Sequence, residues 1–202
     1  MTTKPQKLTT PLGTAVYPAL KRPDTKYHDL GQYKADVSIP IETAKPLMEK
    51  LSKYFKEQTG AAPNQTENTM FKVEVGEDGN PKGTVLFKLR IKNRMTKQGE
   101  VWDRKPKMFG ADLTPAPAAD PRGGSKIKVS FELYSWDAQG KKGVSLQPVA
   151  VKIVELVSGE AADGADFGFD KEDGYVPEGT EGTEGFVDET ELDDSDDSNG
   201  DF

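Results

Sequence analysis

The sequence predicts a mainly β domain over residues 1–158, followed by an acidic tail over residues 159–202. Apolar and polar residues alternate along several segments of the first part, as in strands that bury one face. A single segment carries apolar residues at helical spacing. The charges are segregated: residues 1–158 hold 26 Lys and Arg against 17 Asp and Glu, whereas the tail holds one Lys against 17 acids.

The alternation predicts the strands in chain order, and turn-forming Gly, Pro, Asn and Asp separate them. The predicted strands cover residues 33–39, 71–75, 84–95, 125–136 and 144–157. Residues 110–124 are rich in Pro, Ala and Gly, so we expect a surface loop there.

One helix is predicted between the first two of these strands. Its apolar stripe consists of Leu47, Met48, Leu51, Tyr54 and Phe55. We expect Thr43 to cap its start, Pro46 to lie in its first turn and Gly60 to close its end.

Five or more strands with one inserted helix favour a small closed or nearly closed barrel, for which the oligonucleotide-binding (OB) fold is the commonest solution. A β-sandwich is the alternative, and strand counting does not separate the two. The tail has few apolar residues to offset its ordering entropy, so we expect it to be disordered.

A row of cations follows one face of the predicted strand 84–95. These residues are Lys88, Arg90, Lys92 and Arg94. Same-face residues lie about 6.6–6.8 Å apart, close to the backbone spacing of an extended nucleic-acid strand. The row therefore indicates an anion-binding face, and a solvated outer face is the alternative.

Two other segments mix cations with aromatic rings. The outward face of strand 125–136 carries Lys126, Lys128, Tyr134 and Trp136, and the segment 102–109 carries Trp102, Arg104, Lys105 and Lys107. Cations that neutralise phosphates beside rings that stack on bases are typical of single-strand binding. Alternatively, the rings lie under a loop or the tail, with Trp102 inside the barrel. A weaker group, which is compatible with one side of a groove or with ordinary surface, comprises Tyr17, Lys21, Arg22, Lys26 and Tyr27.

Other functional classes have little support. The chain has no Cys and one His, His28, which we expect to be solvated in a polar loop. No catalytic set, metal site or cofactor site can be assembled, so we expect none. No apolar run reaches the roughly 18–20 residues that span a bilayer, so we expect no membrane partner. The N-terminus lacks the apolar stretch of a secretory signal, which predicts an intracellular protein.

The tail ends in a run of acids and an aromatic residue: Asp193, Asp194, Asp196, Asp197, Asp201 and Phe202. A tethered polyanion competes with nucleic acid for a cationic face at high effective concentration. Its aromatic end is also suited to a partner's pocket with a basic rim. A solubility tail is the alternative.

Three stretches resemble the single-stranded DNA-binding proteins of short-tailed bacteriophage replication systems. They are Pro11–Ala15 near the start, the tail end Gly200–Phe202, and a set of final strands over residues 123–129, 134–136, 144–147 and 154–156. The middle of the chain matches loosely, and the 40–70 region is shorter and differently composed.

The resemblance implies an OB barrel that coats single-stranded DNA during phage replication, recombination and repair. It implies tail contacts with the phage DNA polymerase and helicase–primase, a possible homodimer, and a location in the cytoplasm of the infected bacterial host. Two alternatives remain: a protein-docking or assembly module whose basic face binds acidic protein, and an RNA-binding barrel.

Overall fold

The computed structural model describes residues 7–63, 70–138 and 140–157, and the tail therefore lies outside the described residues. In these ranges the chain forms one helix, α1 (Ile41–Thr59), and thirteen strands. The strands are β1 (Lys7–Thr9), β2 (Gly13–Ala15), β3 (Ala19–Asp24), β4 (Gln32–Lys34), β5 (Val37–Pro40), β6 (Phe71–Val75), β7 (Pro81–Phe87), β8 (Arg90–Lys92), β9 (Arg94–Met95), β10 (Val101–Trp102), β11 (Lys107–Phe109), β12 (Lys126–Ala138) and β13 (Lys141–Glu155).

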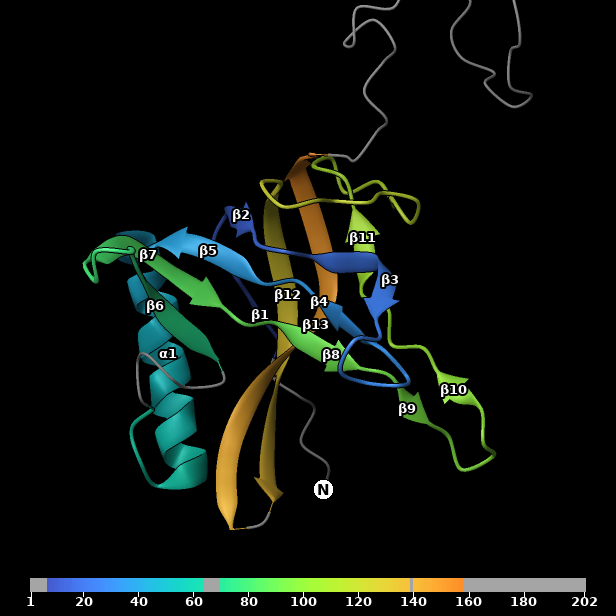
Figure 1. Ribbon diagram of the computed structural model, residues 1–202, viewed down its shortest axis with the longest axis horizontal. Coiled ribbons are helices and arrows are strands. Elements are labelled where there is room, and N and C mark those ends of the chain that lie inside the picture. Colours follow the sequence, from blue (N-terminus) through green and yellow to red (C-terminus); the bar gives the residue numbers. More distant parts are fainter. Residues whose placement is uncertain (1–6, 64–69, 139, 158–202) are drawn as a thin grey trace, which may run out of the picture. The chain divides into compact units, whose positions relative to one another are not determined.

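The strands wrap around a shared core. The largest sheet has the order β11-β13-β12-β2-β5-β7-β6, with β1 beside β12, and a second sheet has the order β3-β4-β8 (Figure 1). Leu89, two residues after β7, forms a parallel bridge with Leu146 of β13. A single bridge thus links the chain just after β7 to β13, across the core from the β5–β7 pairing. The predicted mainly β, OB-type architecture with one inserted helix is confirmed.

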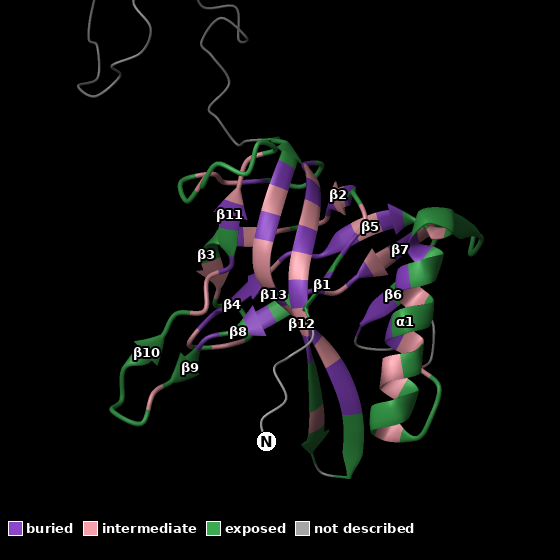
Figure 2. Cartoon of the chain, turned by 180° about the vertical axis from the view of Figure 1, so that it is seen from behind, coloured by how far each residue is buried: buried purple, intermediate pink, exposed green. Residues whose placement is uncertain are grey.

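The long β12–β13 hairpin shows the predicted alternation most clearly. In β12, Ile127, Val129, Phe131 and Leu133 are buried, and the residues between them are partly exposed (Figure 2). The inward row joins a core that includes Phe71 and Phe87, whose ring centroids lie 5.9 Å apart. Since apolar burial is the main driving force of folding, this hairpin is the central wall of the fold.

Two predicted strands are interrupted where the sheet bends. The predicted strand 33–39 divides into β4 and β5, and the predicted strand 84–95 divides into β7, β8 and β9. Asp36 lies between β4 and β5, and Leu89 lies between β7 and β8. The buried Asp36 carboxylate accepts the backbone N–H of Leu89 at 3.0 Å in place of a ladder partner, so the two breaks meet at this contact. The bend turns β8 away from the β5–β7 pairing toward β4 and β13.

The helix covers one end of the β7–β6 side of the sheet (Figure 1). Its predicted stripe is confirmed, because Leu47 and Leu51 are buried and Met48, Tyr54 and Phe55 pack against the core. The predicted start is wrong: the helix begins at Ile41 with Pro40 at the cap position, and Pro46 lies inside it. Gly60 closes it in the left-handed conformation, as expected. No helix in the described ranges is long and apolar enough to cross a membrane.

Candidate nucleic-acid interface

A groove of about 660 Å³ opens on the outer side of the barrel where β8 meets β13. Its cations come from the β7–β8–β9 segment and from the chain after β10, and its far wall comes from β12 and β13. The lining residues are His28, Gln32, Lys88, Arg90, Lys92, Asn93, Arg94, Arg104, Tyr134, Ser145, Leu146 and Gln147.

The predicted row of cations lies along this groove. Arg90, Lys92 and Arg94 are exposed and Lys88 is half-buried, and all four line the hollow. The alternate residues Val85, Phe87, Leu89 and Ile91 are buried. The predicted alternation of buried and outward residues is therefore confirmed. It continues through the bend, although the predicted strand is divided there.

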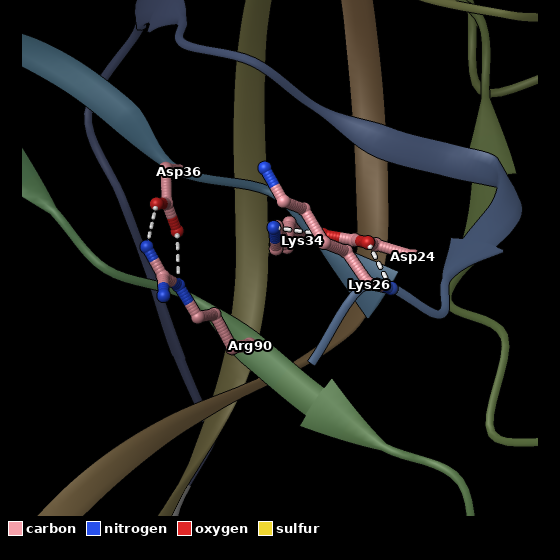
Figure 3. A network of polar contacts seen from close by, with 5 residues as sticks. All are labelled: Asp24, Lys26, Lys34, Asp36 and Arg90. Carbon is pink, nitrogen blue, oxygen red and sulfur yellow. Dashed lines mark hydrogen bonds and ion pairs between the residues drawn. The ribbon is translucent and has the colours of Figure 1, made fainter. Parts of the chain in front are cut away.

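Arg90 is held by an internal carboxylate. Its Nη2 donates a hydrogen bond of 2.7 Å to Asp36 Oδ2, and its Nε donates a longer one of 3.4 Å to Oδ1 (Figure 3). Only 8% of the Asp36 side chain is exposed, against 47% of the Arg90 side chain. The hydrogen bond to Asp36 raises the pKa of Arg90 above its ordinary value. Asp36 thus orients one cation and neutralises part of the groove's charge.

Two arginines lie over two exposed aromatic rings at the edge of the groove. Arg94 Cζ lies 5.6 Å from the ring centroid of Tyr134, and Arg104 Cζ lies 5.2 Å from that of Trp102. Both distances are within the range of cation–π attraction. Arg104 also donates to Gln147 Oε1 at 2.9 Å. Burial, and then the charge of Arg94, lowers the pKa of Arg104 from its ordinary value.

Trp102 is 55% exposed, so it is not tucked into the barrel. It lies on the β9–β10 hairpin, where it is the cross-strand partner of Arg94. Directly paired residues in an antiparallel ladder share a face. The face of the hairpin that carries Trp102 therefore also carries a cation of the groove.

Buried polar contacts fix the base of this hairpin. Asn93 is 4% exposed; its Nδ2 donates to the Leu30 carbonyl at 2.9 Å, and its Oδ1 accepts the Arg104 N–H at 2.9 Å. Burial, and then the influence of Asp103 on the other stem, raises the pKa of the buried Tyr33 to about 12. Both stems of the hairpin are thereby tied to the barrel.

The remaining predicted site residues lie outside the groove lining. Lys126 and Lys128 are near the start of β12, where Lys126 donates to Thr14 Oγ1 and Lys128 is paired with Lys152 of β13. Lys105 is half-buried and Lys107 is exposed on β11, which pairs with β13. Trp136 packs against Gly143 near the end of α1, in a small hollow with Gln58 and Thr59. The predicted tail residues Asp193, Asp194, Asp196, Asp197, Asp201 and Phe202 lie outside the described residues.

Several polar residues of the groove were not predicted. Gln147 and Ser145 occupy the outward parity of β13, which could have indicated them. Asn93 was detectable as a polar residue on the buried parity of the predicted strand 84–95. His28, expected to be solvated, lines the groove, and its buried Nδ1 has no hydrogen-bond partner among the described residues. Within the same residues, no cluster of three His, Cys, Asp or Glu could hold a metal ion.

The comparisons with known proteins agree with this fold. No family model and no curated protein matches the chain. Among solved structures, gp2.5, a single-stranded DNA-binding protein encoded by bacteriophage T7, is 24% identical with a TM-score of 0.61, covering 86% of this chain and 100% of that one.

The single-stranded DNA-binding protein from bacteriophage Enc34 is also similar. Its complex with single-stranded DNA is 14% identical with a TM-score of 0.56, covering 77% of this chain and 89% of that one. A C-terminal truncation of the same protein is 12% identical with a TM-score of 0.57, covering 75% of this chain and 87% of that one. The resemblance to phage single-stranded DNA-binding proteins is thus confirmed at the level of the fold.

Proposed function

We propose that this chain binds single-stranded DNA with little sequence preference and without catalysis. The observation that carries the proposal is the convergence of five cations and an exposed aromatic ring in one groove, with a second exposed ring at its edge. The fold shared with the phage proteins of T7 and Enc34 supports it, because those proteins are single-stranded DNA-binding proteins.

The groove offers the two kinds of contact that such binding requires. Lys88, Arg90 and Lys92 follow one side and would neutralise successive phosphates. Tyr134 and Trp102 would stack on bases, and each such contact stabilises a complex by about 1–3 kcal/mol whatever the base. Gln32 and Gln147 add side-chain amides that are suited to hydrogen bonds with base edges or sugars.

Intrinsic tryptophan fluorescence tests the proposal, because the two tryptophans lie in different places. A thymidine oligomer should quench the fluorescence of the full chain, and moderate salt should reverse the quenching because bound phosphates release counterions. Trp136→Phe should keep this signal, since Trp136 lies apart from the groove. Trp102→Phe should lose most of it. No quenching, together with no binding by a second method, would reject the proposed function in favour of a protein-docking module.

The nature of the nucleic acid is tested by comparing oligomers of one sequence. We expect thymidine DNA oligomers to bind at least as tightly as uridine RNA oligomers, because the described residues of the groove include no arrangement dedicated to the 2′-hydroxyl. A clear preference for RNA would replace the proposal with the RNA-binding barrel.

The role of the tail also belongs to this proposal. The net charge is +9 over residues 1–158 and −16 over residues 159–202, which supports competition between the tail and DNA for the groove. Release of the tail by DNA would then free Phe202 and the acids before it to recruit replication proteins such as the phage polymerase and helicase–primase. We extend the proposal to roles in phage replication, recombination and repair in the host cytoplasm, and to a possible homodimer.

A further inference from the structure

A second hollow lies on the β3 side of the barrel, outside the groove described above. It has a volume of about 510 Å³ and is lined by residues 18–24, Asp120 and Arg122. Its lining carries both cations and carboxylates, so the kind of ligand that it can bind depends on which of these charges are already paired within the protein.

The carboxylates of this hollow are already engaged. Asp24 binds Lys34 and the backbone N–H of Lys26, and the Lys34 hydrogen bond is the largest cause that lowers the pKa of Asp24 (Figure 3). Asp120 pairs with Arg122 at 3.2 Å. In contrast, Lys21 and Arg22 are exposed and form no ion pair with any described residue. Two uncompensated cations therefore remain at the hollow.

An aromatic ring stands at the entrance to β3 in an unfavourable backbone conformation. Tyr17 is 88% exposed and has φ of 44°, in the left-handed region, directly before Pro18. A residue before proline favours extended conformations, and a side chain other than Gly, Asn or Asp is disfavoured in the left-handed region. The exposed ring gains little from burial, and strained residues of this kind cluster at functional sites.

The second hollow is close to the groove. Asp24 lines the second hollow and forms an ion pair with Lys34 of β4. Lys34 is in turn the cross-strand partner of Arg90 of β8, which lines the groove. The three strands β3, β4 and β8 are neighbours in one sheet. Neighbouring strands lie about 4.8 Å apart, so β3 is about 10 Å from β8. One or two nucleotides of an extended strand can cross this distance.

We propose that Tyr17, Lys21 and Arg22 form a second contact surface for single-stranded nucleic acid, which continues the path of a strand bound in the groove. Lys21 and Arg22 would neutralise phosphates, and Tyr17 would stack on a base beyond the β3–β4–β8 sheet. This inference rests on the proposed function and predicts that the binding site extends past the groove.

The length dependence of binding to the full chain tests the inference. Thymidine oligomers of about 5 and about 15 nucleotides lie within the range of known barrel sites. In the double variant Lys21→Ala, Arg22→Ala, we expect the affinity for the longer oligomer to fall by about tenfold at about 0.1 M salt, with a salt slope shallower by about 1.4. The affinity for the shorter oligomer should stay within about twofold, because the groove alone can hold it.

Two further variants isolate the cause. Lys50→Ala, Lys53→Ala removes the same charge from the exposed side of α1 and should leave the length dependence unchanged. Tyr17→Gly suits the backbone conformation, so it should fold, and it should weaken binding of the longer oligomer alone. If the Lys21, Arg22 variant binds both lengths like the parent chain, the second surface is rejected while the groove stands. If the parent chain binds neither length, the proposed function fails and the inference fails with it.

Discussion

At the scale of single residues, Asp36 has two opposing effects. Its buried carboxylate accepts hydrogen bonds from the Leu89 N–H and from the Arg90 guanidinium. It therefore stabilises the bend between β7 and β8 on which the groove is built. The same carboxylate also places a negative charge beside a surface that we propose binds phosphates.

Substitution of Asp36 separates these effects. Asp36→Asn keeps an acceptor for the Leu89 N–H but removes the charge, so the free energy of unfolding should fall by about 1–2 kcal/mol. Affinity for a thymidine oligomer should rise, by about two- to fivefold at low salt, because one neutralising charge is gone. Urea unfolding and DNA titration of the same preparation measure both quantities. Unchanged stability combined with weaker binding would contradict this account of Asp36.

At the scale of elements, the β9–β10 hairpin depends on its base. Asn93 links the hairpin to the Leu30 carbonyl and the Arg104 N–H, and the tip is closed by a turn in which Thr96 Oγ1 accepts the Glu100 N–H. Because Trp102 and Arg94 share one face of the hairpin, the hairpin positions a ring and a cation together.

Asn93→Ala should therefore weaken DNA binding without removing any charge. The Arg104 N–H and Leu30 carbonyl would lose their partners, at a cost of about 1–3 kcal/mol in the free energy of unfolding. Affinity should fall by about tenfold while the salt slope stays the same, because every cation is retained. Asn93→Asp keeps the acceptor for Arg104, but it places a buried negative charge against the Leu30 carbonyl and in the groove lining, so it should weaken binding more than Asn93→Ala. A shallower salt slope in Asn93→Ala would indicate lost phosphate contacts rather than lost positioning.

The elements also show what the sequence could predict. Alternation predicted the inward and outward rows of β7, β8 and β12, because burial of one face imposes it. The division of the predicted strand 84–95 could not be predicted, since it depends on Asp36, which lies 53 residues from Leu89 along the chain. Strands β1, β2, β9, β10 and β11 have only two or three residues each and are too short for a period to show.

The candidate site was predicted in part for the same reason. Tyr134 and Trp136 share a face of β12 by parity, yet only Tyr134 lines the groove. The β12–β13 hairpin continues beyond the barrel toward the end of α1 (Figure 1), so residues on one face have different neighbours along its length. The alternation along a strand predicts which residues share a face, but the residues that this face contacts depend on the tertiary structure.

At the scale of the whole molecule, the segregation of charge is the dominant property. A chain with net charge −7 would repel DNA if its charges were evenly spread. Concentrating 17 acids in residues 159–202 leaves a cationic domain, and in the mechanism that we propose tethering would couple the two parts at high effective concentration. The salt dependence of DNA binding should therefore reflect competition between two polyanions for the cationic domain, the DNA and the tail.

Charge neutralisation in the full chain tests this competition. The variant carrying Asn at positions 193, 194, 196 and 197 in place of Asp should bind a thymidine oligomer about three- to tenfold more tightly at low salt, because a weaker competitor is displaced. A matched control replaces four exposed acids of the domain, Glu42, Glu49, Glu57 and Glu77, with Gln. Both variants gain four units of charge, so a general charge effect would raise their affinities equally. A larger gain in the tail variant indicates competition for the groove, and equal gains would mean that the tail acts only through the net charge of the molecule.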